Sequence, residues 1–181
     1  MKEPLHFGAQ EWKKHFGIEV TEPMIPSTIK EILENKCPFW PDKHIKESHF
    51  LCLIPNDLTL QKLCELTQCL SRSSLSTETT DLHWILITRK IIPTTSEQSF
   101  STVEKIVSER GYKIPTLLEA ATAVLAAKSL QVALFPSRED FTACQEKYNG
   151  THVLVGYDSI APCSIYVNNL GDIAGAAGVW Y

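Results

Sequence analysis

The chain has 181 residues, of which 44% are hydrophobic and 21% are charged, so it can bury a full core and does not have the composition of a disordered protein. Its formal net charge of −4 gives no electrostatic reason for binding along nucleic acid or an anionic membrane. The length predicts a single globular domain over residues 1–181, with residues 1–26 as an alternative N-terminal arm.

The N-terminal sequence lacks the apolar stretch of a secretory signal, which predicts a reducing, cytoplasmic environment. The six cysteines are therefore expected to be free thiols, most of them buried as small hydrophobic side chains. Export without a cleaved signal and the oligomeric state are left open by the sequence.

The first part of the chain predicts two short helices, over residues 9–16 and about 27–35, joined by an extended connector that contains two prolines. Residues 37–41, CPFWP, predict a stiff irregular loop, because prolines at that spacing exclude regular structure. Residues 49–55, HFLCLIP, form a continuous apolar run that is typical of a strand covered on both faces.

The middle of the chain predicts a helix, a loop, a strand and a second helix. Leucines at helical spacing indicate a helix over about residues 56–70, and the polar residues 71–81 predict a loop. Residues 82–92, LHWILITRKII, are β-branched and aromatic and predict a central strand. Residues 101–104 have the spacing of a capping box, which predicts a helix that ends at Gly111.

The longest strongly helical run is residues 114–130, IPTLLEAATAVLAAKSL. It carries a broad apolar stripe and a second face of alanines, so two other elements are needed to cover it. Its apolar stretch without charge, residues 120–127, is far shorter than the ~20 residues that a membrane span requires. We therefore expect a buried core helix around which the fold is organised.

The last part of the chain predicts a helix from Ser137 to about Tyr148, closed by Asn149-Gly150. Three strands are expected after it, over residues 152–157, 164–167 and 174–181, and the last two are expected to form a C-terminal β-hairpin. The predicted fold class is α+β, with a mixed or mainly antiparallel sheet packed by about five or six helices.

The densest group of reactive side chains consists of Cys37, His44 and His49. A catalytic site built from it would use Cys37 as nucleophile and His49 or His44 as base. A metal site would have one thiolate and two imidazoles, in a spacing that matches no zinc motif. Catalytic residues stay unassigned with these three as candidates, and the sequence predicts no bound metal and no cofactor.

Other polar residues offer weaker patterns. Cys144 and His152 pose the same nucleophile-and-base question. Arg89 and Lys90, at the end of the predicted central strand, can receive an anionic group, although exposed basic residues at strand ends are usually solvated. No serine triad, paired-carboxylate motif or nucleotide fingerprint is present in the sequence.

Several stretches occur in a characteristic order: FGAQEWKKHFG, CPFWPDKHIKESHFLCLIP, WILITRKIIP, GYKIPTLLEAATAVL, HVLVGYDS, and the closing IYVNN and GVWY. Together they resemble an uncharacterised family of bacterial proteins found mainly in obligate intracellular bacteria related to the chlamydiae. The similarity spans nearly the whole chain but implies no reaction, cofactor or functional residue. The tail departs from the family pattern, because Val-Trp-Tyr stands where a basic residue often precedes the final aromatic.

The absence of a catalytic signature and the resemblance together favour a non-catalytic domain that binds a protein partner, in the interplay of an intracellular bacterium with its host. The alternative is a cysteine-dependent hydrolase or transferase that uses Cys37 with His49 or His44, and a metal-binding domain ranks third. Neither a nucleic-acid partner nor a membrane span is expected.

Overall fold

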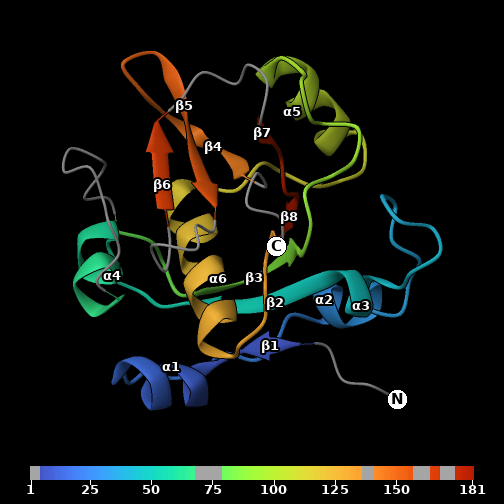
Figure 1. Ribbon diagram of the computed structural model, residues 1–181. Coiled ribbons are helices and arrows are strands. Elements are labelled where there is room, and N and C mark those ends of the chain that lie inside the picture. The colour runs from blue at the N-terminus through green and yellow to red at the C-terminus, as the bar shows by residue number, and fades with distance from the viewer. Residues whose placement is uncertain (1–4, 68–78, 136–140, 157–163, 168–173) are drawn as a thin grey trace.

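The computed structural model describes residues 5–67, 79–135, 141–156, 164–167 and 174–181. The six helices in these ranges are α1 (Ala9–Phe16), α2 (Ser27–Ile32), α3 (Ile45–Ser48), α4 (Leu60–Thr67), α5 (Phe100–Ser108) and α6 (Leu117–Ser129). The strands are β1 (His6–Phe7), β2 (His49–Ile54), β3 (His83–Thr88), β4 (Phe141–Tyr148), β5 (Thr151–Gly156), β6 (Ser164–Val167), β7 (Ala174–Gly175) and β8 (Val179–Trp180). The α+β class predicted from the sequence is confirmed (Figure 1).

The strands form two four-stranded sheets, where the sequence predicted one. The first has the order β1-β2-β3-β8, with β1 parallel to β2 and the other pairs antiparallel. The second has the order β6-β5-β4-β7, with β7 parallel to β4 and the other pairs antiparallel. Both sheets are mixed, which agrees with the predicted sheet type.

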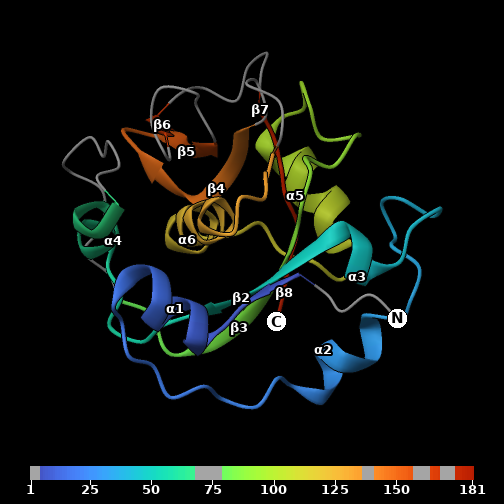
Figure 2. The same ribbon diagram turned by 60° about the horizontal axis from the view of Figure 1, so that its bottom comes forward.

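The helix α6 lies between the two sheets (Figure 2). Ten of its thirteen residues are buried, because its stripe of large apolar residues and its alanine face each meet a sheet. Thr116 caps the helix, and its side-chain oxygen accepts a hydrogen bond from the backbone N–H of Glu119. The prediction of a core helix with two covered faces is confirmed.

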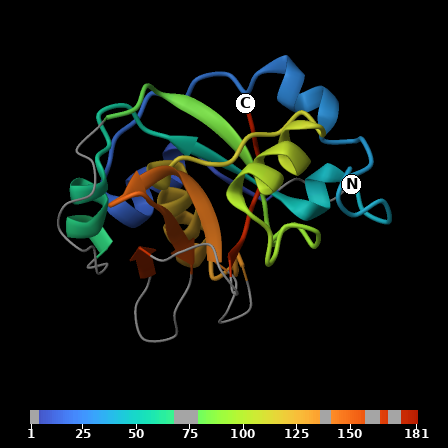
Figure 3. The same cartoon turned by 90° about the horizontal axis from the view of Figure 1, so that it is seen from above.

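The helix α2 lies on the opposite face of the first sheet, whereas α1 lies beside β1 on the side of α6 (Figure 2). Trp12 of α1 is completely buried, and its indole Nε1 donates a hydrogen bond to the Leu53 carbonyl oxygen at 2.8 Å. Its ring meets that of Phe7 edge-on, with centroids 5.2 Å apart. Seen from above, α4 and α5 lie on either side of α6 (Figure 3).

The helix predicted over residues 137–148 is wrong where the structure describes it, because residues 141–148 form β4. Ser137, the predicted helix cap, lies outside the described residues. Asn149 and Gly150 both have positive φ, 49° and 80°, and they join β4 to β5 as a two-residue hairpin turn. The Asn-Gly pair that we interpreted as a helix end is therefore a strand reversal.

The predicted pairing of residues 164–167 with residues 174–181 is also wrong. Strand β6 pairs with β5, whereas β7 pairs with β4 and β8 with β3. A hairpin near the C-terminus is present, but it is formed by β4 and β5. The segment of residues 174–181 therefore ties the two sheets together, because β7 belongs to the second sheet and β8 to the first.

Smaller differences concern helix ends and cysteines. The helix α3 was not predicted, and α5 begins after a Ser99 cap, two residues before the expected capping box. Cys37, Cys52 and Cys144 are buried free thiols and Cys64 is a partly exposed one, as expected, while Cys69 and Cys163 lie outside the described residues. None of the helices in the described ranges is long and apolar enough to cross a membrane.

Candidate functional site

Cys37, the nucleophile considered from the sequence, is buried, with 1% of its surface exposed. Its backbone N–H donates to the Lys43 carbonyl oxygen at 2.9 Å, which closes the loop of residues 37–43 on itself. Burial of this kind shields the thiol from solvent and is typical of a structural cysteine.

His44 lies at the start of α3, where it is the residue that precedes the first helical turn. Its backbone N–H donates to Glu47 Oε2 at 2.9 Å, and its ring Nδ1 lies 3.5 Å from the same oxygen. This backbone hydrogen bond is the main reason why the pKa of Glu47 is lowered. The imidazole of His44 therefore belongs to a helix cap on the surface.

His49 begins β2 and is buried, with Nδ1 2.9 Å from Ser48 Oγ and 3.2 Å from the Ile45 carbonyl oxygen. Burial lowers its pKa to about 4, so the ring is neutral at pH 7. Its Nε2 and the hydroxyl of neighbouring Tyr112 are buried without a hydrogen-bond partner among the described residues. Among these residues no hydrogen bond joins the Cys37 thiol to His44 or His49.

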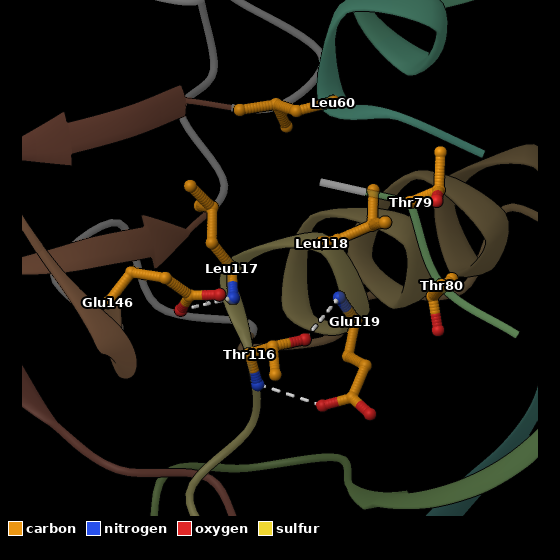
Figure 4. Close-up of a pocket in the computed structure, with 8 residues that line it drawn as sticks. All are labelled: Leu60, Thr79, Thr80, Thr116, Leu117, Leu118, Glu119 and Glu146. Carbon is orange, nitrogen blue, oxygen red and sulfur yellow. Dashed lines mark hydrogen bonds between the residues drawn. The ribbon is translucent and has the colours of Figure 1, made fainter. Parts of the chain in front are cut away.

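A polar cluster that the sequence analysis did not single out is centred on Glu119 of α6, whose side chain is 5% exposed. Its Oε2 accepts hydrogen bonds from the Thr116 backbone N–H at 2.8 Å and from the Tyr181 hydroxyl at 3.1 Å. Its Oε1 lies 3.2 Å from His83 Nε2. The reciprocal bonds between Thr116 and Glu119 form a capping box at the start of α6 (Figure 4).

His83, the first residue of β3, lies between two groups that only accept hydrogen bonds. Its Nδ1 is 2.6 Å from the Asp81 carbonyl oxygen, and its Nε2 faces the Glu119 carboxylate. Both contacts are hydrogen bonds at once only when both ring nitrogens carry a proton. The geometry is therefore that of an imidazolium paired with a buried carboxylate.

The charges of this pair stabilise each other. Burial alone favours the neutral form of His83, but the hydrogen bonds to Glu119 and to the Asp81 carbonyl oxygen outweigh it and raise the pKa of His83. Burial likewise favours the neutral form of Glu119, and the hydrogen bonds from His83, Thr116 and Tyr181 outweigh it and lower the pKa of Glu119. Burial and the nearby Glu119 raise the pKa of the Tyr181 hydroxyl, which stays a donor.

Two hollows meet at this cluster, and both are lined by Thr80 and Glu119. The smaller has a volume of about 150 Å³ and lies at the start of α6, where Glu146 Oε2 accepts a hydrogen bond from the Leu117 backbone N–H at 2.7 Å (Figure 4). The larger has a volume of about 560 Å³ and is lined by side chains that include Met24, Trp84 and Tyr181. Glu119 therefore lies between a small recess of mixed polar and apolar lining and a wider, largely apolar one.

The row Thr80, His83 and Glu119 has the composition of a nucleophile, base and carboxylate triad. Thr80 Oγ1 lies 3.4 Å from His83 Nδ1. The same nitrogen is only 2.6 Å from the Asp81 carbonyl oxygen, so it donates its proton there and has no lone pair with which to activate a hydroxyl. This arrangement is suited to holding a charge in place, and it does not form a base for nucleophilic attack.

Within the described ranges, no group of three or more His, Cys, Asp or Glu side chains is arranged to hold a metal ion. His83 and Glu119 supply two such side chains, and the hydrogen bonds of Glu119 already occupy both of its oxygens. The cluster accordingly offers no further ligands for a cation.

Comparisons of the chain with protein-family models, with curated proteins and with solved structures found no match. The resemblance to the family of chlamydia-related bacteria therefore stays a prediction.

One signal in the sequence could have identified part of this site. Thr116 and Glu119 have the spacing of a capping box directly before an apolar helix. The partners of Glu119, His83 and Tyr181, are 36 and 62 residues away along the chain, so no local pattern pointed to them.

Proposed function

We propose that this domain binds an extended segment of a partner protein along the free edge of β3. The observation that carries the proposal is the incomplete pairing of that edge. Strand β3 begins at His83, but β8 pairs only with Leu86 and Ile87. Among the described strands, none lies beside the remaining residues, His83–Ile85, on that side.

The larger hollow is located at this part of the edge. Successive side chains of a strand point to opposite faces, and His83 and Trp84 do so here. The indole Nε1 of Trp84 donates to the Pro23 carbonyl oxygen at 3.0 Å, whereas His83 contacts Glu119 near α6. Because the hollow is lined by residues from both sides, it wraps around the edge of the strand.

The surface of the hollow is apolar in a way that favours a protein ligand. Met24, with 91% of its surface exposed, and Tyr181, with 38%, are the exposed large hydrophobic residues of the described chain. Both line this hollow. Exposed apolar residues gathered in one concave place support the binding of a partner side chain.

The mode of binding is the addition of a strand. A segment that continues the line of β8, antiparallel to β3, can bond to the backbone N–H and carbonyl oxygen of Trp84, because alternate residues of a strand direct these groups to opposite sides and those of His83 and Ile85 point toward β2. Its large apolar side chain then packs between Met24 and Tyr181. This proposal keeps the non-catalytic interaction domain expected from the sequence and gives the partner a chemical description.

The test is a selection of peptides from a random library on the folded protein, followed by affinity measurements with the enriched peptides. We expect these peptides to share a large apolar residue and to bind at least about ten-fold more weakly to Met24→Glu, which buries a charge at the contact. The control, Ser108→Glu, adds the same carboxylate to an exposed position of α5 and should leave affinity unchanged.

The position of binding is read from the backbone amide NMR signals. Shifts concentrated at His83, Trp84 and Ile85 on peptide addition support the proposal. Failure to enrich any peptide, equal binding to Met24→Glu and the native chain, or shifts confined to other elements would overturn it.

A further inference from the structure

A second hollow, separate from the one at His83, gathers positive charge. Its volume is about 170 Å³, and three cationic side chains and one carboxylate are among the residues that line it. The cations are Lys43, Arg89 and Lys90. This concentration of positive charge occurs on a chain whose formal net charge is −4, so it is a local feature and no consequence of overall composition.

These cations are not neutralised by carboxylates in the described part of the chain. Lys43 and Lys90 take part in none of the ion pairs found there. Among the described residues, Arg89 Nη1 donates a hydrogen bond to the backbone carbonyl oxygen of Glu47, at 3.5 Å. The Glu47 carboxylate accepts the His44 backbone N–H, which directs it to the start of α3.

The backbone beneath the cations is fixed by hydrogen bonds. The Arg89 N–H donates to the Ser48 carbonyl oxygen at 2.9 Å, and the Arg89 carbonyl oxygen accepts from the Phe135 N–H at 3.1 Å. The Lys43 N–H donates to the Trp40 carbonyl oxygen at 2.9 Å. A fixed backbone lowers the entropy cost of binding a charged group between these side chains.

An apolar hollow of about 340 Å³ adjoins the cationic one, since Ala133 lines both. Its lining includes Val124, Val132 and Leu134, with Lys128 and Gln131 as its polar members. The partly exposed ring of Trp40 lines the cationic hollow and adds an apolar wall there. The two hollows together present a positive end and a mostly apolar end.

We propose that these adjoining hollows bind a phosphate monoester with an apolar body. The phosphate lies among Lys43, Arg89 and Lys90, where arginine and lysine donate charge-assisted hydrogen bonds to its oxygens. The apolar body passes Ala133 and packs against Val124 and Leu134. Sequence analysis had noted only that Arg89 and Lys90 can receive an anion.

The experiment measures binding of octyl phosphate, inorganic phosphate and octyl glucoside by calorimetry, with the Trp40 indole N–H signal as the local readout. Octyl phosphate should bind most tightly, inorganic phosphate more weakly, and octyl glucoside not measurably. Adenosine monophosphate carries a nucleoside in place of the octyl chain. It should bind more weakly than octyl phosphate if the apolar hollow binds the apolar body of the ligand.

Substitutions of the charged residues test where the phosphate binds. Arg89→Gln and the double change Lys43→Gln with Lys90→Gln should each weaken octyl phosphate binding about ten-fold or more. Glu47→Gln should strengthen it by removing the carboxylate from the lining. Lys62→Gln, an exposed lysine of α4, is the matched control and should have no effect.

Thermal unfolding of each variant shows that it is folded before affinity is compared. No binding of octyl phosphate, or binding that is unchanged in both cation variants, would overturn the proposal. Equal affinity for octyl phosphate and inorganic phosphate would overturn its apolar part. None of these results tests peptide binding at β3, because the two sites share no lining residue.

Discussion

His49 and His83 are the first residues of two neighbouring antiparallel strands, so they lie at opposite ends of the same sheet. Both are partly or fully buried, but only His83 has an acceptor at each ring nitrogen. Accordingly the pKa of His83 is raised and that of His49 is lowered to about 4. The difference shows that burial without an acceptor at each ring nitrogen favours the neutral form of a histidine. An acceptor at each nitrogen favours the charged form, as for His83 beside the larger hollow.

The largest effect expected on this comparison comes from Glu119→Ala. The change removes the acceptor of the Thr116 N–H and leaves His83 without its counter-charge, so we expect a loss of about 3 kcal/mol in the free energy of unfolding. Glu119→Gln keeps the size and one acceptor and should cost less. Urea unfolding at pH 7 measures both, and equal midpoints for the alanine variant and the native chain would contradict the described network.

The second effect concerns His49 on the acid side. Its folded pKa of about 4 lies below the unfolded value near 6.5, so the unfolded chain binds the proton first and stability falls as pH falls through this interval. We expect a loss of about 1.5–2 kcal/mol between pH 6.5 and pH 5. In His49→Phe this loss should disappear, and identical slopes in both proteins would be evidence against a buried neutral ring.

Tyr181→Phe is expected to have a moderate effect. It removes one hydrogen bond to Glu119 but keeps the ring, so the free energy of unfolding should fall by about 1 kcal/mol. The aromatic lining of the hollow is unchanged, and peptide affinity should be retained. Denaturant unfolding measures the contribution of the Tyr181 hydroxyl to stability, and peptide titration of the same variant measures its contribution to binding. A loss of affinity without a loss of stability would contradict this expectation.

The smallest effect concerns His83 on the alkaline side. Because its folded pKa is raised, its contribution to stability is complete below pH 6.5 and is lost as pH rises through the folded pKa. The ring is partly exposed, so solvent screens the interaction and the change is small. His83→Gln should abolish this slope above pH 6.5, which unfolding curves at pH 6.5 and pH 8.5 can measure.

The elements that sequence predicted best are those whose patterns are local. The continuous apolar run of residues 49–55 became β2, and the alanine-rich run of residues 114–130 became α6 with two covered faces. The spacing of Phe141, Cys144 and Tyr148 suits one side of a helix, yet these residues form β4. Sheet pairing decided that case, and pairing partners are not visible in a window of ten residues.

The candidate sites were less predictable for the same reason. Cys37, His44 and His49 are close in sequence, but no hydrogen bond among the described residues joins the Cys37 thiol to either imidazole. Glu119 acquires its partners from β3 and from the tail after β8, which lie on other parts of the chain. The pair Arg89 and Lys90 was visible at a strand end, whereas Lys43 joined it only through folding.

The most direct test is an NMR titration of the histidine ring nitrogens in the native protein between pH 4 and pH 9. We expect a raised pKa at His83, with both ring nitrogens protonated when it pairs with Glu119, and a His49 ring that stays neutral until about pH 4. A normal or lowered pKa at His83, or a charged His49 at neutral pH, would contradict this prediction. In that case His83 and Glu119 would not form a charged pair in the lining of the hollow at the edge of β3.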